Sequence, residues 1–543
     1  MVTQVPRGGL TSVEQSLVEH VGRGEWLDLI PKVPKDKTVD EDTMRSWDES
    51  QTVGATVIRN VLRGRLAAHP DPHGLRLRGA RITGQLDLQN LSTDVNLELK
   101  DCLLEEGILA QDARLASVTL AGCQLEHPTE SPLDADRLAC SVLILSDARI
   151  IGHADAGAVC LRGAHIGGDL DCIGASLRND SGPALRADGL RVGQSVFLYR
   201  FTATTDSDAG AVRLLGAHIG DQLECDGARL RNDSGPALAA DGLQVARNVF
   251  LRNVFIARGR GDLGAVRLLG ARIGGELDCR NAGLHNDSGP ALNAYSLEVG
   301  QNMFLSSGFQ ATGAGRGQVI DLTGARVGGR LSFDPARLEH FDSRYRLAVD
   351  GLTYVGAPTP FARQWLGLLR NGTPDYAGQP YQQLAAGYRA LGDERQARDI
   401  LMTQREDELT RTHPGRAERW WGKITKVTLG YGYQPWRALL FLTGVVVLSC
   451  VLAIVLGSCG ALAQTDKTAN PGDSCTLIQQ ASVGLDLNLP IGKSVARDRC
   501  DLVKDSTNAA AAWLAATGWV LQLLAWAFAA LFIAGFTSAV RKT

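Results

Sequence analysis

Aromatic side chains are scarce in this chain of 543 residues and make up only 6% of it. Glycine is abundant, at 61 residues, and many glycines with few large side chains favour a narrow, tightly wound architecture. Neither sign of charge is in large excess, because 56 basic and 59 acidic residues leave a net charge of −3. We therefore expect no nucleic-acid partner, since there is neither a global basic field nor an acidic excess that would mimic DNA.

No apolar run occurs in residues 1–12, so we expect no secretory signal. Most of the 11 cysteines precede the first long apolar segment, and a reducing cytosol would keep them as thiols. The sequence also contains no Walker loop, zinc-ligand spacing, nucleophile elbow or haem motif. It therefore predicts no catalytic residue, no cofactor and no metal ligand.

A repeat of 53 or 54 residues dominates the centre of the chain. Its three best copies are GAVCLRGAHIGGDLDC, GAVRLLGAHIGDQLEC and GAVRLLGARIGGELDC, which begin at Gly157, Gly210 and Gly264. A weaker similarity at half that period indicates a coil of 26–27 residues. Apolar residues alternate within each coil, which is typical of strands, and glycines and Asn-Asp-Ser-Gly-Pro segments supply turns. The sequence thus predicts a mainly β chain with a parallel β-helix of about 10 coils.

Three cysteines recur at one position of alternate coils, namely Cys172, Cys225 and Cys279. Coils stack at about 4.8 Å, so matching positions two coils apart are separated by about 9.6 Å. A disulfide needs Cα atoms within about 7 Å, and zinc holds thiolate sulfurs at about 2.3 Å. Leucine occupies the intervening coils, so we expect this column to be a packed part of the core.

Charged side chains form two further columns, which the alternation places on the outer surface. Carboxylates beside histidines suggest acid–base chemistry, but the coil spacing favours a solvated face or a binding face. We treat these residues as the candidate binding face: His165, Asp171, His218, Glu224, Arg272, Asp278 and Arg326.

Helical patterns flank the repeats. A capping box from Thr11 to Glu14 opens a helix expected over 11–30, and a second helix is expected over 56–66. The predicted domains are an N-terminal helical cap (1–70), the β-solenoid (71–345), a short helical linker with one hairpin of tetratricopeptide type (346–430) and a membrane module (431–543).

Two long segments in the membrane module contain no charged residue. They predict transmembrane spans at about 438–458 and 513–536, joined by an extracytoplasmic loop at 459–508. Basic residues precede the first span, and Arg541 and Lys542 follow the second. The positive-inside rule then predicts a two-span protein of the cell membrane with both termini in the cytoplasm.

The predicted loop faces an oxidising compartment and contains Cys459, Cys475 and Cys500. One disulfide and one spare thiol are expected, and Cys475–Cys500 is the favoured pair.

Three motifs carry a resemblance to other chains: the LRGARI-type coils, PYQQLAAGYRALGDERQARDIL from Pro380, and GYGYQPWRALLFL from Gly430. Together they resemble a group of uncharacterised bacterial, especially actinobacterial, membrane proteins similar in style to pentapeptide-repeat proteins. Chains of this kind are sometimes labelled membrane-associated oxidoreductases. If the chain is an enzyme, the resemblance implies that activity.

Three functions are therefore in view. The leading hypothesis is a non-catalytic scaffold, anchored in the lipid bilayer, that binds an unknown cytoplasmic protein. The second is a channel or membrane sensor, which two spans form only as a homo-oligomer. The third is the membrane-associated oxidoreductase.

Overall fold

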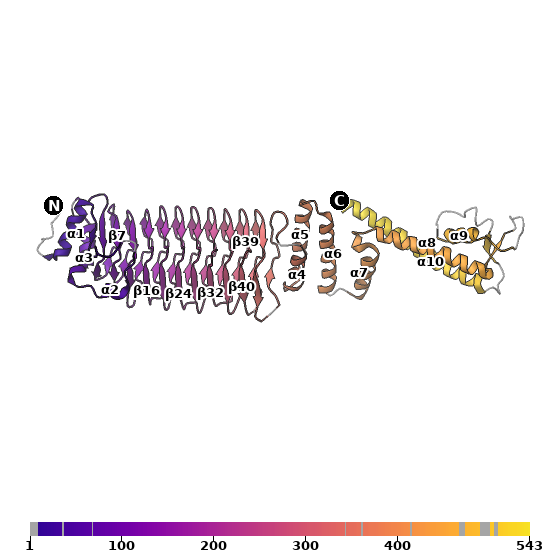
Figure 1. Ribbon diagram of the computed structural model, residues 1–543, viewed down its shortest axis with the longest axis horizontal. Helices are drawn as coiled ribbons and strands as arrows, with labels where there is room; N and C mark the ends of the chain where they lie inside the picture. The colour runs from indigo at the N-terminus through magenta and orange to yellow at the C-terminus, as the bar shows by residue number, and fades with distance from the viewer. Residues whose placement is uncertain are drawn as a thin grey trace. The chain divides into compact units, whose positions relative to one another are not determined.

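The structure of the chain is a computed structural model. It describes residues 9–34, 37–67, 69–315, 317–342, 344–359, 362–412, 415–465, 473–488, 500–503 and 509–542. Contacts within the chain divide it into two compact units, Met1–Ile400 and Leu401–Thr543. The first unit is a stack of short strands with helices at its ends, and the second is helical (Figure 1).

The stacked strands form a parallel β-solenoid of about 11 turns, which confirms the predicted fold. Every turn crosses four sheets in the same order, which we name A, B, C and D. One central turn consists of β19 (Leu170–Asp171), β20 (Ser176–Asn179), β21 (Leu185–Arg186) and β22 (Arg191–Val192). The next turn begins with β23 (Val196–Phe197), which pairs with β19 and places Val196 beside Leu170.

The sheets extend over nearly the whole unit. Sheet A runs from β1 (Leu27–Asp28) to β43 (Leu331–Phe333), sheet B from β2 (Thr52–Gly54) to β44 (Arg337–His340), sheet C from β5 (Leu86–Asp87) to β45 (Leu347–Ala348), and sheet D from β6 (Ser92–Thr93) to β42 (Arg326–Val327).

The first turns are shorter than the predicted coil length. Leu75 pairs with Leu97, and Leu97 pairs with Val118, so these turns advance by 22 and 21 residues. The difference arises between sheets B and C. Central turns insert the Asn-Asp-Ser-Gly-Pro loop there, whereas the first turn passes from β4 (Arg81–Thr83) almost directly to β5.

The interior is filled by stacked aliphatic side chains and by the cysteine column. The three cysteines are buried and alternate with leucines in register; the column is Cys172, Leu198, Cys225, Leu251, Cys279 and Leu305. Burial raises the pKa of each of these thiols far above its ordinary value. The prediction that they are core residues is confirmed.

A second buried column is polar. Asn179, Asn232 and Asn286 stand at the end of sheet B strands in alternate turns and are 1–2% exposed. The Nδ2 group of Asn232 donates to the carbonyls of Ser207 (2.7 Å) and Pro236 (2.9 Å). Buried polar groups are stable when they are paired in this way. The asparagines therefore fix the loops that the sequence pattern identified only as turns.

The N-terminal cap is small. Its helices are α1 (Ser12–Arg23), α2 (Glu41–Arg45) and α3 (Ala55–Leu62). The predicted capping box of Thr11 and Glu14 is formed, but the helix expected over 11–30 is too long. Gly24 ends α1 in the left-handed conformation with φ = 69°. The chain then pairs with the first turn through β1 and β2, so the cap covers strand edges that would otherwise be open.

Helices also close the other end of the solenoid. They are α4 (Ala362–Asn371) and α5 (Gln379–Ala390), and α6 (Glu394–Arg411) follows them in the chain. The side-chain amides of Gln379 and Gln383 donate to the carbonyls of Leu352 and Tyr354 in the last turn. A Cβ on Gly387 would lie 2.3 Å from the Gly356 carbonyl oxygen, so glycine is needed for α5 to pack this closely.

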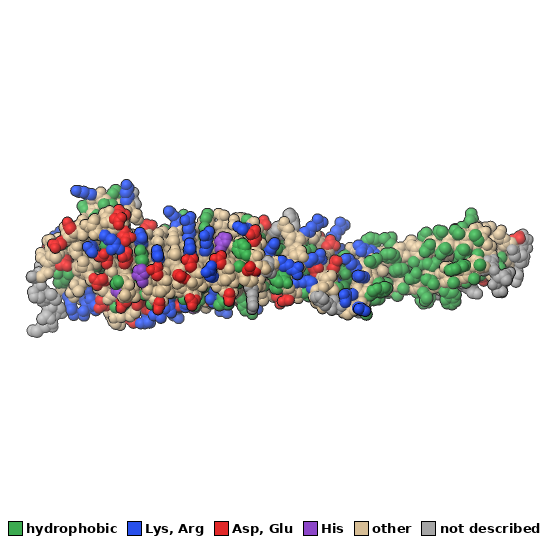
Figure 2. Space-filling model, turned by 90° about the horizontal axis from the view of Figure 1, so that it is seen from below, with side chains coloured by type: hydrophobic (Ala, Val, Ile, Leu, Met, Phe, Trp, Pro, Cys, Tyr) green, Lys and Arg blue, Asp and Glu red, His purple; other side chains and the backbone are tan. Residues whose placement is uncertain are grey.

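The second unit contains α7 (Arg416–Leu429), α8 (Trp436–Leu456), α9 (Leu477–Asp486) and α10 (Ala509–Lys542). The helices α8 and α10 pack side by side, with the ring centroids of Phe441 and Phe528 5.4 Å apart. Two segments, Trp436–Ala461 and Ala509–Thr537, are long and apolar enough to cross a membrane. Hydrophobic side chains cover this pair of helices in Figure 2.

Candidate functional site

The predicted binding face is divided between two sheets. His165, on β18 (His165–Ile166), belongs to sheet D, whereas Asp171, on β19, belongs to sheet A. The glycines Gly167 and Gly168 lie between the two strands. The seven candidate residues therefore do not form one face. They form a basic column on sheet D (His165, His218, Arg272 and Arg326) and an acidic column on sheet A (Asp171, Glu224 and Asp278).

The acidic column is less exposed than expected, since Asp171 and Glu224 are half-buried and Asp278 is buried in ion pairs. Asp278 is 1% exposed and accepts hydrogen bonds from Arg280, at 2.9 Å from Nε. Arg252 lies 3.6 Å from the same carboxylate. Burial alone would raise the pKa of Asp278, but the Arg280 hydrogen bonds and the charge of Arg252 outweigh it, and the net direction is downward. Asp278 therefore holds neighbouring turns together.

Aromatic side chains alternate with the acids on sheet A. Arg252 lies over the ring of Phe250 at 4.1 Å, and Arg280 lies over Phe304 at 4.9 Å. Such cation–π contacts add to the ion pairs. The other two acids differ, because Asp171 accepts a hydrogen bond from Ser146 (2.9 Å), whereas burial and Asp226 raise the pKa of Glu224. Asp171 and Asp278 are thus already bonded to other residues of their own chain.

The basic column on sheet D is different. His165, Arg191 and His218 are exposed and occupy three successive turns, one beside the next. Within the residues that the structure describes, no carboxylate lies within ion-pair distance of Arg191 or of either histidine. Because strands in a sheet are about 4.8 Å apart, this part of sheet D presents a closely spaced row of one arginine between two histidines, which we call the basic row.

The same column continues toward the C-terminus with mixed charge. Arg272 and Arg326 both contact Glu298, each at 3.4 Å. Arg272 and Arg326 are therefore paired, whereas Arg191 has no ion pair among the described residues. Figure 2 shows acidic and basic side chains intermingled over one face of the solenoid.

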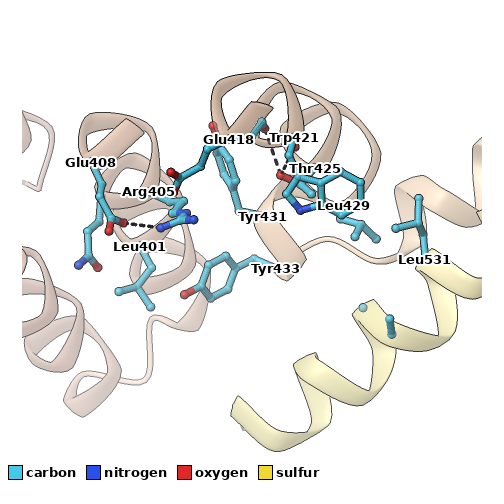
Figure 3. A pocket seen from close by; sticks show the side chains of 15 residues that line it. Leu401, Arg405, Glu408, Glu418, Trp421, Thr425, Leu429, Tyr431, Tyr433 and Leu531 are labelled. Carbon is cyan, nitrogen blue, oxygen red and sulfur yellow. Dashed lines mark hydrogen bonds and ion pairs between the residues drawn. The ribbon is translucent and has the colours of Figure 1, made fainter. Parts of the chain in front are cut away.

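The second unit contains a cavity of about 500 Å³ between α6, α7 and α10. Trp421, Tyr431 and Tyr433 contribute aromatic walls, and Arg405 and Glu408 form an ion pair at its edge with an N–O distance of 2.7 Å (Figure 3). The helical pattern of α6 was predictable, but its packing against α7 was not, and these residues were not singled out from the sequence.

Two glycines allow the helices around this cavity to pack closely. A Cβ on Gly422 would lie 2.5 Å from Leu409 Cδ1, and one on Gly535 would lie 3.0 Å from Leu429 Cδ2. Both glycines therefore bring helices together around the cavity. Tyr431 has φ = 56°, a conformation that non-glycine residues rarely adopt, and burial raises the pKa of its hydroxyl.

Exposed tryptophans lie on α7 and at the first residue of α8. Trp420, Trp421 and Trp436 are 71%, 59% and 55% exposed, and basic residues of α7 lie beside them in the chain. Exposed tryptophans at the end of an apolar helix are typical of the boundary between a membrane and water. The basic and aromatic side chains of this segment thus resemble those of an interfacial helix.

Between the two apolar helices, Cys475 and Cys500 form a disulfide with Cα atoms 6.2 Å apart, and Cys459 is a free, exposed thiol. The strands β46 (Leu462–Gln464) and β47 (Cys500–Leu502) pair in antiparallel fashion nearby. The helix α9 packs directly on α8, because Ser449 Oγ donates to the Gly484 carbonyl at 2.6 Å. The rest of the predicted loop, residues 466–472, 489–499 and 504–508, lies outside the described residues, as do the side chains of Arg541 and Lys542.

In the described part of the chain, no three His, Cys, Asp or Glu side chains are grouped so that they could hold a metal ion. Comparisons with family models, with curated proteins and with solved structures found no match to this chain. The β-solenoid is compatible with a repeat-rich protein, while the resemblance to a particular bacterial group rests on the sequence motifs alone.

Proposed function

We propose that this protein is a membrane-anchored scaffold. In this proposal α8 and α10 span the cell membrane, both termini lie in the cytoplasm, and the solenoid binds a cytoplasmic protein without catalysing a reaction. The observation that carries it is the combination, in one chain, of an in-register stack of about 11 turns with two helices long and apolar enough to cross a bilayer. Stacked repeats of this kind commonly supply extended binding surfaces.

The basic row on sheet D is the surface that best fits a partner. Among the described residues, His165, Arg191 and His218 are exposed and have no ion-pair partner, and His218 uses only its Nδ1 atom, on the Gly216 carbonyl at 3.0 Å, whereas Asp278 on sheet A forms internal ion pairs. Complementary charge steers and orients association. The partner segment that matches this row is acidic.

A cross-linking experiment tests the scaffold. A photo-reactive amino acid replaces Arg191 in the full-length chain expressed in cells, and the matched control replaces Arg231, an exposed arginine of sheet B that pairs with Asp233. The scaffold predicts a discrete protein adduct from position 191 whose cross-linked segment is acidic, and no such adduct from position 231. Equal adducts from both positions, or adducts with lipid alone, would contradict it.

One observation favours a second candidate, an oligomeric channel or membrane sensor. The helix α9 lies in sequence between the two apolar helices and packs on α8, where a Cβ on Gly484 would be only 2.6 Å from Cys450 Cα. Two helices cannot enclose a pore alone, so this candidate requires several copies of the chain. The mass of the purified protein in mild detergent decides it, because a monomer contradicts a pore.

A further inference from the structure

A second cavity, of about 730 Å³, lies at the C-terminal end of the solenoid. The last turn and α4 form its walls, so it lies wholly within the first unit. Phe333, Leu338 and Trp365 contribute apolar surface, whereas Arg344, Arg346 and the Gln364 amide contribute polar groups. Its volume is within the range of sites that bind small molecules.

Trp365 carries an unmatched hydrogen-bond donor. The residue is 2% exposed, and its ring is held by Phe333 at 5.3 Å and Tyr354 at 6.5 Å between centroids. Its Nε1 atom is buried and has no acceptor among the residues that the structure describes. Buried N–H groups are almost always paired, so the missing acceptor points to a group supplied from outside the chain.

The charge of the cavity indicates what that group is. Arg344 and Arg346 both line it and are exposed, and Asp334 is the one acidic residue among its described lining. Neither arginine has an ion-pair partner within the described part of the chain. The backbone of Arg346 is fixed, because its N–H donates to the Gly372 carbonyl at 2.6 Å. The cavity thus combines an excess of positive charge with an apolar wall.

We propose that this cavity binds a small amphiphilic anion. Its phosphate or carboxylate group pairs with Arg344 and Arg346, since guanidinium groups form strong, directional bonds with such anions. Its apolar body packs on Phe333, Leu338 and Trp365, and one of its oxygens accepts a hydrogen bond from Trp365 Nε1–H. Both a short anionic lipid and a soluble aromatic phosphate have this chemistry. The site is independent of the basic row on sheet D.

Fluorine NMR on the full-length protein in detergent tests the proposal. The protein is labelled with 5-fluorotryptophan, and the signal that disappears in Trp365→Phe is assigned to Trp365. The probes are phenyl phosphate, dihexanoyl phosphatidic acid, inorganic phosphate and benzylamine. We expect a saturable shift of the Trp365 signal with the first two probes, at least tenfold weaker binding of inorganic phosphate, and no shift with benzylamine. If dihexanoyl phosphatidic acid binds more tightly than phenyl phosphate, the ligand is a lipid. If phenyl phosphate binds more tightly, the ligand is a soluble phosphate.

Arg346→Gln is expected to raise the Kd for phenyl phosphate at least tenfold. The matched control is Arg337→Gln, because Arg337 is an exposed arginine of the last turn that pairs with Glu339 and does not line the cavity. If Arg346→Gln does not fold, Arg344→Gln replaces it. The proposal is wrong if no anionic probe moves the Trp365 signal, if benzylamine moves it equally, or if both arginine variants bind as the wild type does.

Discussion

Replacement of Asn232 by aspartate tests the polar ladder inside the solenoid. The Asn232 side chain makes four hydrogen bonds: its amide donates to Ser207 O and Pro236 O, and its oxygen accepts from Ser207 N (3.1 Å) and Ser234 N (3.2 Å). Aspartate has nearly the same shape and keeps the two acceptor bonds. It loses both donor bonds and turns an oxygen toward two buried carbonyls.

The expected cost follows from those bonds. A hydrogen bond contributes about 0.5–1.5 kcal/mol net, and a buried polar group left unpaired costs about 1–3 kcal/mol. We therefore expect Asn232→Asp to weaken the local turn by about 2–4 kcal/mol at neutral pH. Burial and the facing carbonyls raise the pKa of the new carboxyl, so the loss is largest above its folded pKa and decreases as the pH falls.

Hydrogen exchange on the full-length protein measures this local stability. Amides in residues 202–236 of Asn232→Asp are expected to exchange at least tenfold faster than in the wild type, since 1.4 kcal/mol corresponds to about a factor of 10. The control is Asn281→Asp, the same chemical change at an exposed position. Equal protection of both variants would refute the proposed role of the ladder.

Four further predictions concern other parts of the chain. Asp278→Asn should lower the melting temperature, because it breaks the ion pairs with Arg280 and Arg252. The pKa of the Asp278 carboxyl is lowered in the folded wild type, so this stabilisation is present above pH 3.8 and is lost as the pH falls below that value. A series of melting curves between neutral and acid pH measures the loss. Burial and nearby arginines lower the pKa of His285, so the wild type should lose stability as the pH falls below 6.5, and His285→Gln should flatten that part of the curve. Gly484→Ala should lower the melting temperature in nanodiscs, since its Cβ would meet the α8 backbone, whereas Gly444→Ala, where the Cβ meets nothing, should not. Finally, thiol labelling under denaturing conditions should modify Cys475 and Cys500 only after reduction, and labelling of both without reductant would exclude the disulfide.

Much of the solenoid was predictable, because the alternation of apolar residues and the spacing of the repeats follow directly from strand geometry. The corner at Gly167 and Gly168 was not. It separates His165 from Asp171 onto different sheets, and three intervening residues leave no periodicity that distinguishes a corner from a continuing strand. The partners of Asp278 were also hidden, since Arg252 comes from the previous turn and only the register places it beside the carboxylate.

The ends of the fold were harder to predict. Gly24 interrupts an amphipathic pattern that continues beyond it, so the first helix was predicted too long. The cavity at Trp365 depends on how α4 packs against the last turn, and the pattern of a single helix does not contain its orientation. The cysteines of the second unit were distinguishable from the core cysteines because they lie outside the repeat.

Membrane extraction tests the central claim most directly. Vesicles containing the full-length protein are washed with alkaline carbonate and floated, beside a variant with Val447→Arg and Leu523→Arg, two exposed apolar positions in the candidate spans. An arginine at the centre of a membrane helix costs about 2.5–3.5 kcal/mol. The account predicts that the wild type floats with the vesicles and that the variant is largely released. Release of the folded wild type into the aqueous fraction would contradict the membrane anchor.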